Sequence, residues 1–68
     1  MHIEILLKQV REEKGVPLKK LSEKSGVSTS HISDIEKNFK MPSLLVMVKI
    51  AKALDVSVTD LYKVIWWK

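Results

Sequence analysis

The stretch from Leu18 to Glu36, LKKLSEKSGVSTSHISDIE, constrains the fold of this chain more than any other. Leu18 and Leu21 are three residues apart, which gives a short helix one apolar edge. Gly26 favours a left-handed helix end, and Ser28 offers a side-chain oxygen that can cap a following helix. Two short helices joined by such a turn form a helix-turn-helix, whose second helix enters the major groove of DNA.

The second expected helix, residues 29–37, has an outer face of short polar side chains. Ile32 and Ile35 are three residues apart, so they lie on the same side of the helix and define its buried face. The outward-pointing residues are then Ser30, Ser33, Asp34 and Lys37, with Thr29 at the leading tip. Spacing alone leaves two interpretations open, a DNA-reading helix and one member of an antiparallel helix pair in a small bundle.

Beyond spacing, the chain resembles the phage repressor/Cro-type helix-turn-helix family, often called the XRE family. The matching residues are Leu21, Gly26-Val27-Ser28, Ile32, Ile35-Glu36, Pro42-Ser43-Leu44 and Lys49-Ile50-Ala51-Lys52-Ala53-Leu54. The resemblance extends from about Ile5 to Tyr62, which is nearly the whole chain. It implies an all-α, five-helix repressor-like bundle that binds double-stranded DNA.

This reading assigns roles to the polar residues around the expected helix-turn-helix. The base-facing residues are expected to be Thr29, Ser30, Ser33 and Asp34. Phosphate contacts are expected from Lys19, Ser28, Lys37, Asn38 and Lys40, and from backbone N–H groups of the loop after the second helix. Because no arginine lies on this face, specificity is expected to depend on thymine methyl groups, hydroxyl contacts, an Asp34 contact to cytosine N4, and DNA shape.

Two further positions are interpreted through the resemblance. It implies that Arg11, the only arginine of the chain, pairs internally with Glu36; the alternative is a solvated Arg11 on a polar face. Family members tend to have a glutamine where this chain has Leu18, and that glutamine usually contacts a DNA phosphate. Leu18 cannot make this contact, so one anchoring interaction is expected to be missing.

The charge distribution favours a polyanionic partner. The 68 residues contain 12 Lys and Arg against 8 Asp and Glu, a formal net charge of +4. Residues 14–40 contain six lysines and three acidic residues, so this segment has a net charge of +3. The positive excess is therefore centred on the expected helix-turn-helix, as phosphate binding requires.

Several classes of function are disfavoured by the composition. The chain has no cysteine, its two histidines are isolated, and no glycine-rich phosphate loop is present. Asp34 and Glu36 are two residues apart, which is about 200° around a helix, so they cannot form a facing acid pair. We therefore predict no enzyme, no metal or cofactor, and no small-molecule ligand. The longest apolar run, Leu44 to Val48, is too short to span a bilayer, and a cytoplasmic protein is expected.

The flanking segments predict three more helices. Ile3, Leu6, Leu7 and Val10 have helical spacing, and Gly15 is expected to end this first helix. A fourth helix is expected to begin at the cap Ser43, and its apolar surface comprises Leu44, Met47, Val48, Ile50, Ala51 and Leu54. Ser57 and Asp60 resemble a capping box that begins a short fifth helix through Lys63.

The tail, residues 64–68, contains four consecutive large apolar residues, Val64, Ile65, Trp66 and Trp67. An extended tail would place them on alternating sides, so one side could cover the core near Ile3 while the other stays exposed. Exposed apolar patches usually mark interfaces, and we expect the tail to form a homodimer. The alternative is a tail that folds wholly onto its own domain or is disordered.

Taken together, the sequence predicts one domain, residues 1–68, with a helix-turn-helix at about 18–36. Its expected function is that of a sequence-specific DNA-binding transcriptional regulator such as a repressor. Two alternatives stay open, an antitoxin-type repressor and a protein-interaction module of the same fold with weak or no DNA binding.

Overall fold

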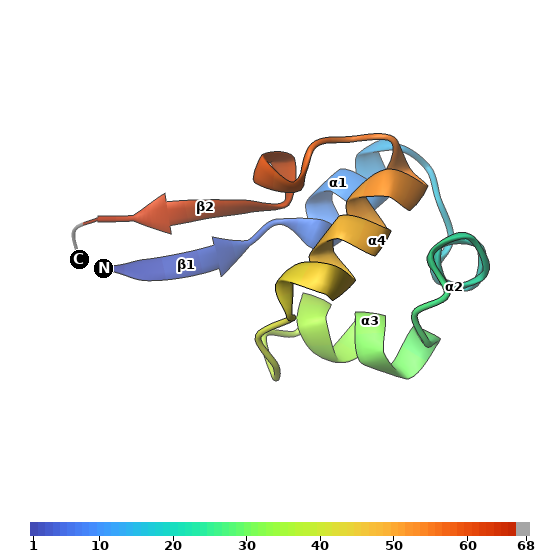
Figure 1. Cartoon of the computed structure of the whole chain (residues 1–68), viewed down its shortest axis with the longest axis horizontal. Coiled ribbons are helices and arrows are strands. Elements are labelled where there is room, and N and C mark those ends of the chain that lie inside the picture. The colour runs from blue at the N-terminus through green and yellow to red at the C-terminus, as the bar shows by residue number, and fades with distance from the viewer. Residues whose placement is uncertain (67–68) are drawn as a thin grey trace.

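Four α-helices and a two-stranded antiparallel sheet form the part of the chain that the computed structural model describes, residues 1–66. In chain order the elements are β1 (His2–Ile5), α1 (Leu7–Glu13), α2 (Leu18–Ser25), α3 (Thr29–Glu36), α4 (Leu44–Leu54), the 3-10 helix η1 (Val58–Leu61) and β2 (Tyr62–Ile65). Figure 1 shows the helices gathered into one body, from which the sheet projects toward the N-terminus. The helix-turn-helix that the sequence predicts is therefore present as α2 and α3.

Every helix contributes to a single buried core. The fully buried side chains are Leu7 of α1, Leu21 of α2, Ile32 and Ile35 of α3, Ile50 of α4, and Leu61 of η1. Ile32 and Ile35 thus face inward, as the helical spacing predicts. Their burial fixes which side of α3 remains toward solvent.

The four α-helices end at residues with a left-handed backbone, namely Gly15, Gly26, Asn38 and Asp55. At the end of α3, the Asn38 N–H donates to the carbonyl of Ile35 (3.1 Å) and the Phe39 N–H donates to that of Asp34 (2.9 Å). This pair of bonds is a Schellman motif, which satisfies carbonyls that the helix itself leaves free. Asn38 therefore supplies the left-handed residue that this motif requires.

The first strand corrects the expected start of the first helix. His2–Ile5 forms β1 and pairs with β2, with Ile3 opposite Val64 and Glu4 opposite Lys63, whereas α1 begins only at Leu7. The alternation of His2, Ile3, Glu4 and Ile5 has the period of a strand, and it competes with the helical spacing read from Ile3 onward. The distant strand β2 decides between the two patterns.

The expected fifth helix is also wrong in kind. The predicted capping box of Ser57 and Asp60 is present, with the Ser57 N–H donating to Asp60 Oδ2 at 3.0 Å, but only the single turn of η1 follows. The backbone becomes extended at Tyr62 and enters β2, which contains Val64 and Ile65 of the predicted tail. The fold is therefore mostly helical with a small sheet, and not an all-α bundle of five α-helices. The prediction for Trp67 lies outside the described residues.

The apolar surface of α4 is narrower than the sequence indicates. Met47, Ile50, Ala51 and Leu54 are buried in the core, as expected. Leu44 and Val48 were expected to join them, but both are exposed, together with Leu45. The residues that pack inward follow the i, i+3, i+4, i+7 rule; Val48 lies off that stripe, and Leu44 is the first residue of the helix, where the stripe runs out of the core.

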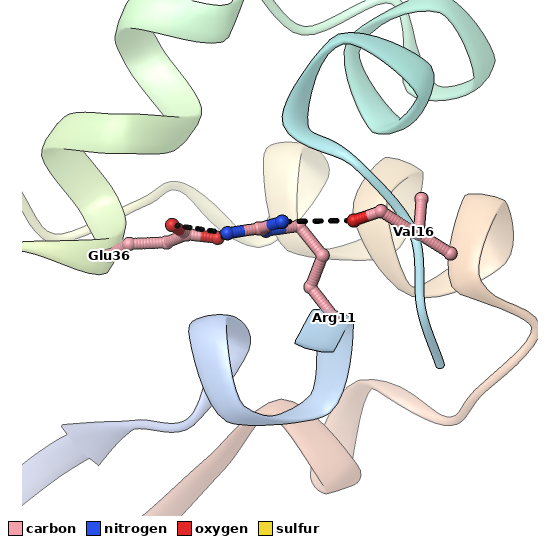
Figure 2. A network of polar contacts seen from close by, with 3 residues as sticks. All are labelled: Arg11, Val16 and Glu36. Carbon is pink, nitrogen blue, oxygen red and sulfur yellow. Dashed lines mark hydrogen bonds and ion pairs between the residues drawn. The ribbon is translucent and has the colours of Figure 1, made fainter. Parts of the chain in front are cut away.

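An ion pair between Arg11 and Glu36 joins α1 to the end of α3 (Figure 2). Arg11 Nε donates to Glu36 Oε2 at 2.7 Å, and Arg11 Nη2 donates to Glu36 Oε1 at 3.3 Å. The third contact, from Nη1 to the carbonyl of Val16 at 2.9 Å, fixes the chain between α1 and α2. One guanidinium thus holds three segments in place.

Burial makes this pair structural. The side chains of Arg11 and Glu36 are only 12% and 6% exposed, so little water screens their interaction. The hydrogen bond to the Glu36 carboxylate raises the pKa of Arg11 above its ordinary value; the charge of Glu36 acts in the same direction and burial in the opposite one. Arg11 consequently keeps its charge over the whole pH range in which a protein of this kind folds.

We expect the Glu36→Leu variant to lower the free energy of unfolding by about 3–5 kcal/mol, because it leaves the buried Arg11 charge without a partner. The double variant Arg11→Leu/Glu36→Leu should lose less than the sum of the two single variants. Urea denaturation followed by circular dichroism measures all three.

The exposed ion pair between Lys63 and Glu4 provides the control. Its side chains are 57% and 50% exposed and its atoms are 3.5 Å apart, so Glu4→Ala should change stability by less than about 1 kcal/mol. A Glu36→Leu variant as stable as Glu4→Ala would contradict the structural role of the buried pair.

Candidate nucleic-acid interface

A tight turn sets the relative orientation of α2 and α3. Gly26 ends α2 with φ of 77°, and its N–H donates to the carbonyl of Ser22 at 2.9 Å. Val27 is buried beneath the turn, and Ser28 Oγ accepts a hydrogen bond from the His31 N–H at 3.1 Å. The predicted cap at Ser28 is confirmed, and its hydroxyl hydrogen is still free to donate outward. The turn therefore fixes where α3 begins.

The outer side of α3 presents the four side chains that were predicted to face bases. Thr29 and Ser30 are exposed, and Ser33 and Asp34 are half-buried. All four lie away from the buried side chains Ile32 and Ile35, which are the inward anchors of this eight-residue helix. The face is thus short-chained and polar, with a single carboxylate.

His31 is a candidate that the sequence interpretation overlooked by treating both histidines as isolated. It lies in the first turn of α3, between Ser30 and Ile32, and is half-buried. Its place in the leading turn of the expected recognition helix was the signal available in the sequence. An imidazole there can donate or accept a hydrogen bond at the edge of the polar face.

Exposed lysines occur in α2, before α3, and in the loop after it. Lys19 is exposed in the first turn of α2, and Lys37 and Lys40 are exposed in the loop that follows α3. Figure 1 shows α2 beside one end of α3 and this loop at the other end. Exposed cations of this kind are the groups that bind DNA phosphates.

The loop after α3 corrects one expectation. The backbone N–H groups of residues 37, 38 and 39 donate to the carbonyls of Ser33, Ile35 and Asp34. They close the end of α3, so they cannot bind phosphate as expected. A phosphate contact by Asn38 would therefore have to come from its exposed side-chain amide.

Leu18 packs against the core instead of facing outward. It is half-buried at the start of α2, in contact with the buried cluster that includes Leu21. The position at which the resemblance implies a phosphate-binding glutamine is thus used for packing. The cationic side chain nearest to it in the sequence is that of Lys19.

Residues 1–66 contain neither a metal cluster nor a membrane-spanning helix. Within this range no group of three or more His, Cys, Asp or Glu side chains is placed to hold a metal ion. No helix of the described part of the chain is long and apolar enough to cross a membrane. The polar face of α3 and its flanking lysines are therefore the main functional candidate.

The sequence of this chain is similar to those of known helix-turn-helix proteins. The sequence model of the helix-turn-helix family matches residues 7–61. The HTH-type transcriptional regulator SinR of Bacillus subtilis is 46% identical over 56 residues, which cover 81% of this chain and 50% of SinR. The HTH-type transcriptional regulator SutR of Escherichia coli is 40% identical over 50 residues, 74% of this chain and 28% of SutR. The chain thus spans half the length of SinR and less of SutR.

Solved structures give the same picture. The N-terminal DNA binding domain of SinR from Bacillus subtilis superimposes with a TM-score of 0.72 at 46% identity, over 78% of each chain. The restriction-modification controller protein C.AhdI from Aeromonas hydrophila gives a TM-score of 0.76 at 30% identity, over 79% of this chain and 82% of that one. This agrees with the prediction that the chain is not an enzyme. The chain belongs to the helix-turn-helix family of the XRE type.

Proposed function

We propose that this chain is a sequence-specific DNA-binding transcriptional regulator that inserts α3 into the major groove. The observation that carries the proposal is the way α3 is held in the fold. Ile32 and Ile35 are buried on its inner side, Glu36 at its end pairs with Arg11, and its outer side is polar. A rigid helix with an unobstructed polar face is what groove reading requires.

The relatives support this proposal by their names. SinR is named a transcriptional regulator and its N-terminal domain a DNA binding domain, and C.AhdI is named a restriction-modification controller protein. We propose that residues 1–68 act as one such domain, with the helix-turn-helix at 18–36, working as a repressor in the cytoplasm. An antitoxin-type repressor would use the same surface.

Contacts to DNA are proposed to divide by chemistry. Lys19, Lys37 and Lys40 would neutralise phosphates, joined by the hydroxyl of Ser28 and the amide of Asn38. The base contacts would come from the outer face of α3, through Thr29, Ser30, Ser33 and Asp34. The lysines would supply affinity and the face of α3 would supply selectivity.

A salt titration of binding to mixed-sequence duplex DNA tests the proposal. The logarithm of the binding constant should fall with the logarithm of salt concentration with a slope of several units, about 0.9 for each phosphate neutralised. The variant Lys19→Gln/Lys37→Gln/Lys40→Gln should flatten this slope, whereas Lys8→Gln on the outside of α1 should not. A slope near zero would instead identify a protein-interaction module of the same fold.

Asp34 should control discrimination between sequences. A carboxylate on the groove face repels phosphates, so a cytosine N4 contact is the natural compensation. The Asp34→Asn variant should relax the preference for one cytosine and raise affinity for non-specific DNA, as measured by selection of bound duplexes from a random pool. Equal weakening on every duplex would contradict this assignment, and Glu12→Gln on α1 is the charge-matched control.

We further propose that the chain forms a homodimer through its tail. Val64 and Ile65 are half-buried in β2, where they pair with β1, and Trp66 follows them with 74% of its surface exposed. A two-fold dimer would hold two copies of α3 one DNA turn apart, about 34 Å. Trp67 was predicted to belong to the same interface.

The Trp66→Ser variant should sediment as a monomer at micromolar concentration, while the wild type sediments as a dimer, because an exposed aromatic side chain is a typical interface anchor. Phe39→Ser is the matched control, since Phe39 is 72% exposed in the loop after α3. A dimer that survives Trp66→Ser, or one that Phe39→Ser dissociates, would contradict the assignment.

A further inference from the structure

The solvent side of α4 carries a second ordered row of side chains. Leu45, Val48, Lys49 and Lys52 have the spacing i, i+3, i+4, i+7, so they lie along one face. The buried stripe that starts at Met47 is offset by two residues, which is about 200° around the helix. We call these four residues the α4 outer stripe; it points away from the core.

The first half of the α4 outer stripe is apolar and unpartnered. Leu45 is 63% exposed and Val48 is 44% exposed, although neither belongs to the hydrophobic core. One exposed apolar side chain would need no explanation, but Leu45 and Val48 lie next to each other on one helix face, as in a site that binds another helix. Helix-in-groove recognition uses anchors of this spacing.

The second half of the α4 outer stripe is cationic. Lys49 and Lys52 line a hollow of about 430 Å³ with Lys24 and Ser25 from the end of α2, and no acidic side chain lines it. The segment from residue 37 to residue 54 contains four lysines and no Asp or Glu. Three lysines therefore line one hollow, with no carboxylate in its lining.

We propose that the α4 outer stripe binds an acidic amphipathic helix from another protein. Leucine-type side chains of that helix would cover Leu45 and Val48, and its carboxylates would enter the lysine-lined hollow. Complementary charge makes such an encounter specific and fast. The site is separate from the polar face of α3, so it does not depend on the function proposed for that face.

Two other occupants fit less well. A second copy packed antiparallel about a two-fold axis would set Lys49 and Lys52 against Leu45 and Val48, so the ammonium groups would lose water without gaining a carboxylate partner. DNA phosphates would satisfy Lys24, Lys49 and Lys52, but they would leave Leu45 and Val48 uncovered. Only a partner that is both apolar and acidic matches the whole stripe.

The test is a titration with two synthetic helix-forming peptides of about five turns, which share one leucine stripe and carry either glutamate or lysine elsewhere. Followed by NMR, the glutamate peptide should shift the methyl signals of Leu45 and Val48 and the amide signals of Lys49 and Lys52. The signals of Thr29 and Ser30 should stay in place. The lysine peptide should bind at least about tenfold more weakly.

A charge-reversal pair completes the design. Lys49→Glu/Lys52→Glu should weaken the glutamate peptide at least about tenfold, whereas Lys8→Glu/Lys14→Glu, with the same change in net charge on the α1 side, should weaken it less than about twofold. Equal effects of the two double variants, or equal binding of the two peptides, would overturn the proposal.

Two further results would reassign the surface. Shifts of the α4 signals on addition of duplex DNA alone would make the stripe a DNA contact. Shifts that grow with the concentration of the chain itself would make it a contact between copies.

Discussion

The buried pair between Arg11 and Glu36 is the interaction on which the placement of α3 depends. An isolated helix of eight residues is unstable in water, so α3 needs tertiary contacts along its length. Ile32 and Ile35 anchor its inner side, but the burial of apolar groups is a non-directional interaction. The ion pair adds a directional contact at the last residue of the helix, and the same guanidinium binds the carbonyl of Val16. Together they hold one end of α3 at a fixed point.

The inward position of the Glu36 side chain affects the charge of the outer surface. Within residues 1–66 the ion pairs are Arg11 with Glu36 and Lys63 with Glu4, so the lysines around α2, α3 and α4 face solvent without a salt bridge. The same carboxylate that locks α3 is thereby removed from the face that would meet phosphates. The inward placement of Glu36 therefore both holds the helix and leaves the nearby lysines without this carboxylate as a partner.

Local signals in the sequence were sufficient for the helix-turn-helix and insufficient for the sheet. Gly26, Ser28 and the two isoleucines of α3 act over a few residues, and the resemblance added the pairing of Arg11 with Glu36. The strand β1 could not be recognised in the same way, because its partner β2 lies about 60 residues away in the sequence. On sequence alone, the helical spacing that begins at Ile3 therefore outweighed the short alternation, although the structure shows that the alternation was the correct signal.

Prediction of the candidate site from the sequence was limited in the same way. The helical wheel predicted which residues of α3 point outward, because that follows from periodicity alone. It could not show that the loop N–H groups after α3 are used by α3 itself, since that depends on the left-handed turn at Asn38. Nor could it show that Val48 is exposed, because its apolar character fits a core position equally well. Exposure at such positions is decided by where neighbouring helices pack.

Amide hydrogen exchange under native conditions tests most directly whether the ion pair is what holds α3 in place. If it is, the Glu36→Leu variant should lose protection first and most in the amides of α3, from Ile32 to Glu36, while α4 keeps amides that exchange only through global unfolding. A uniform loss of protection across α3 and α4 would contradict the account, since the pair would then contribute only to overall stability.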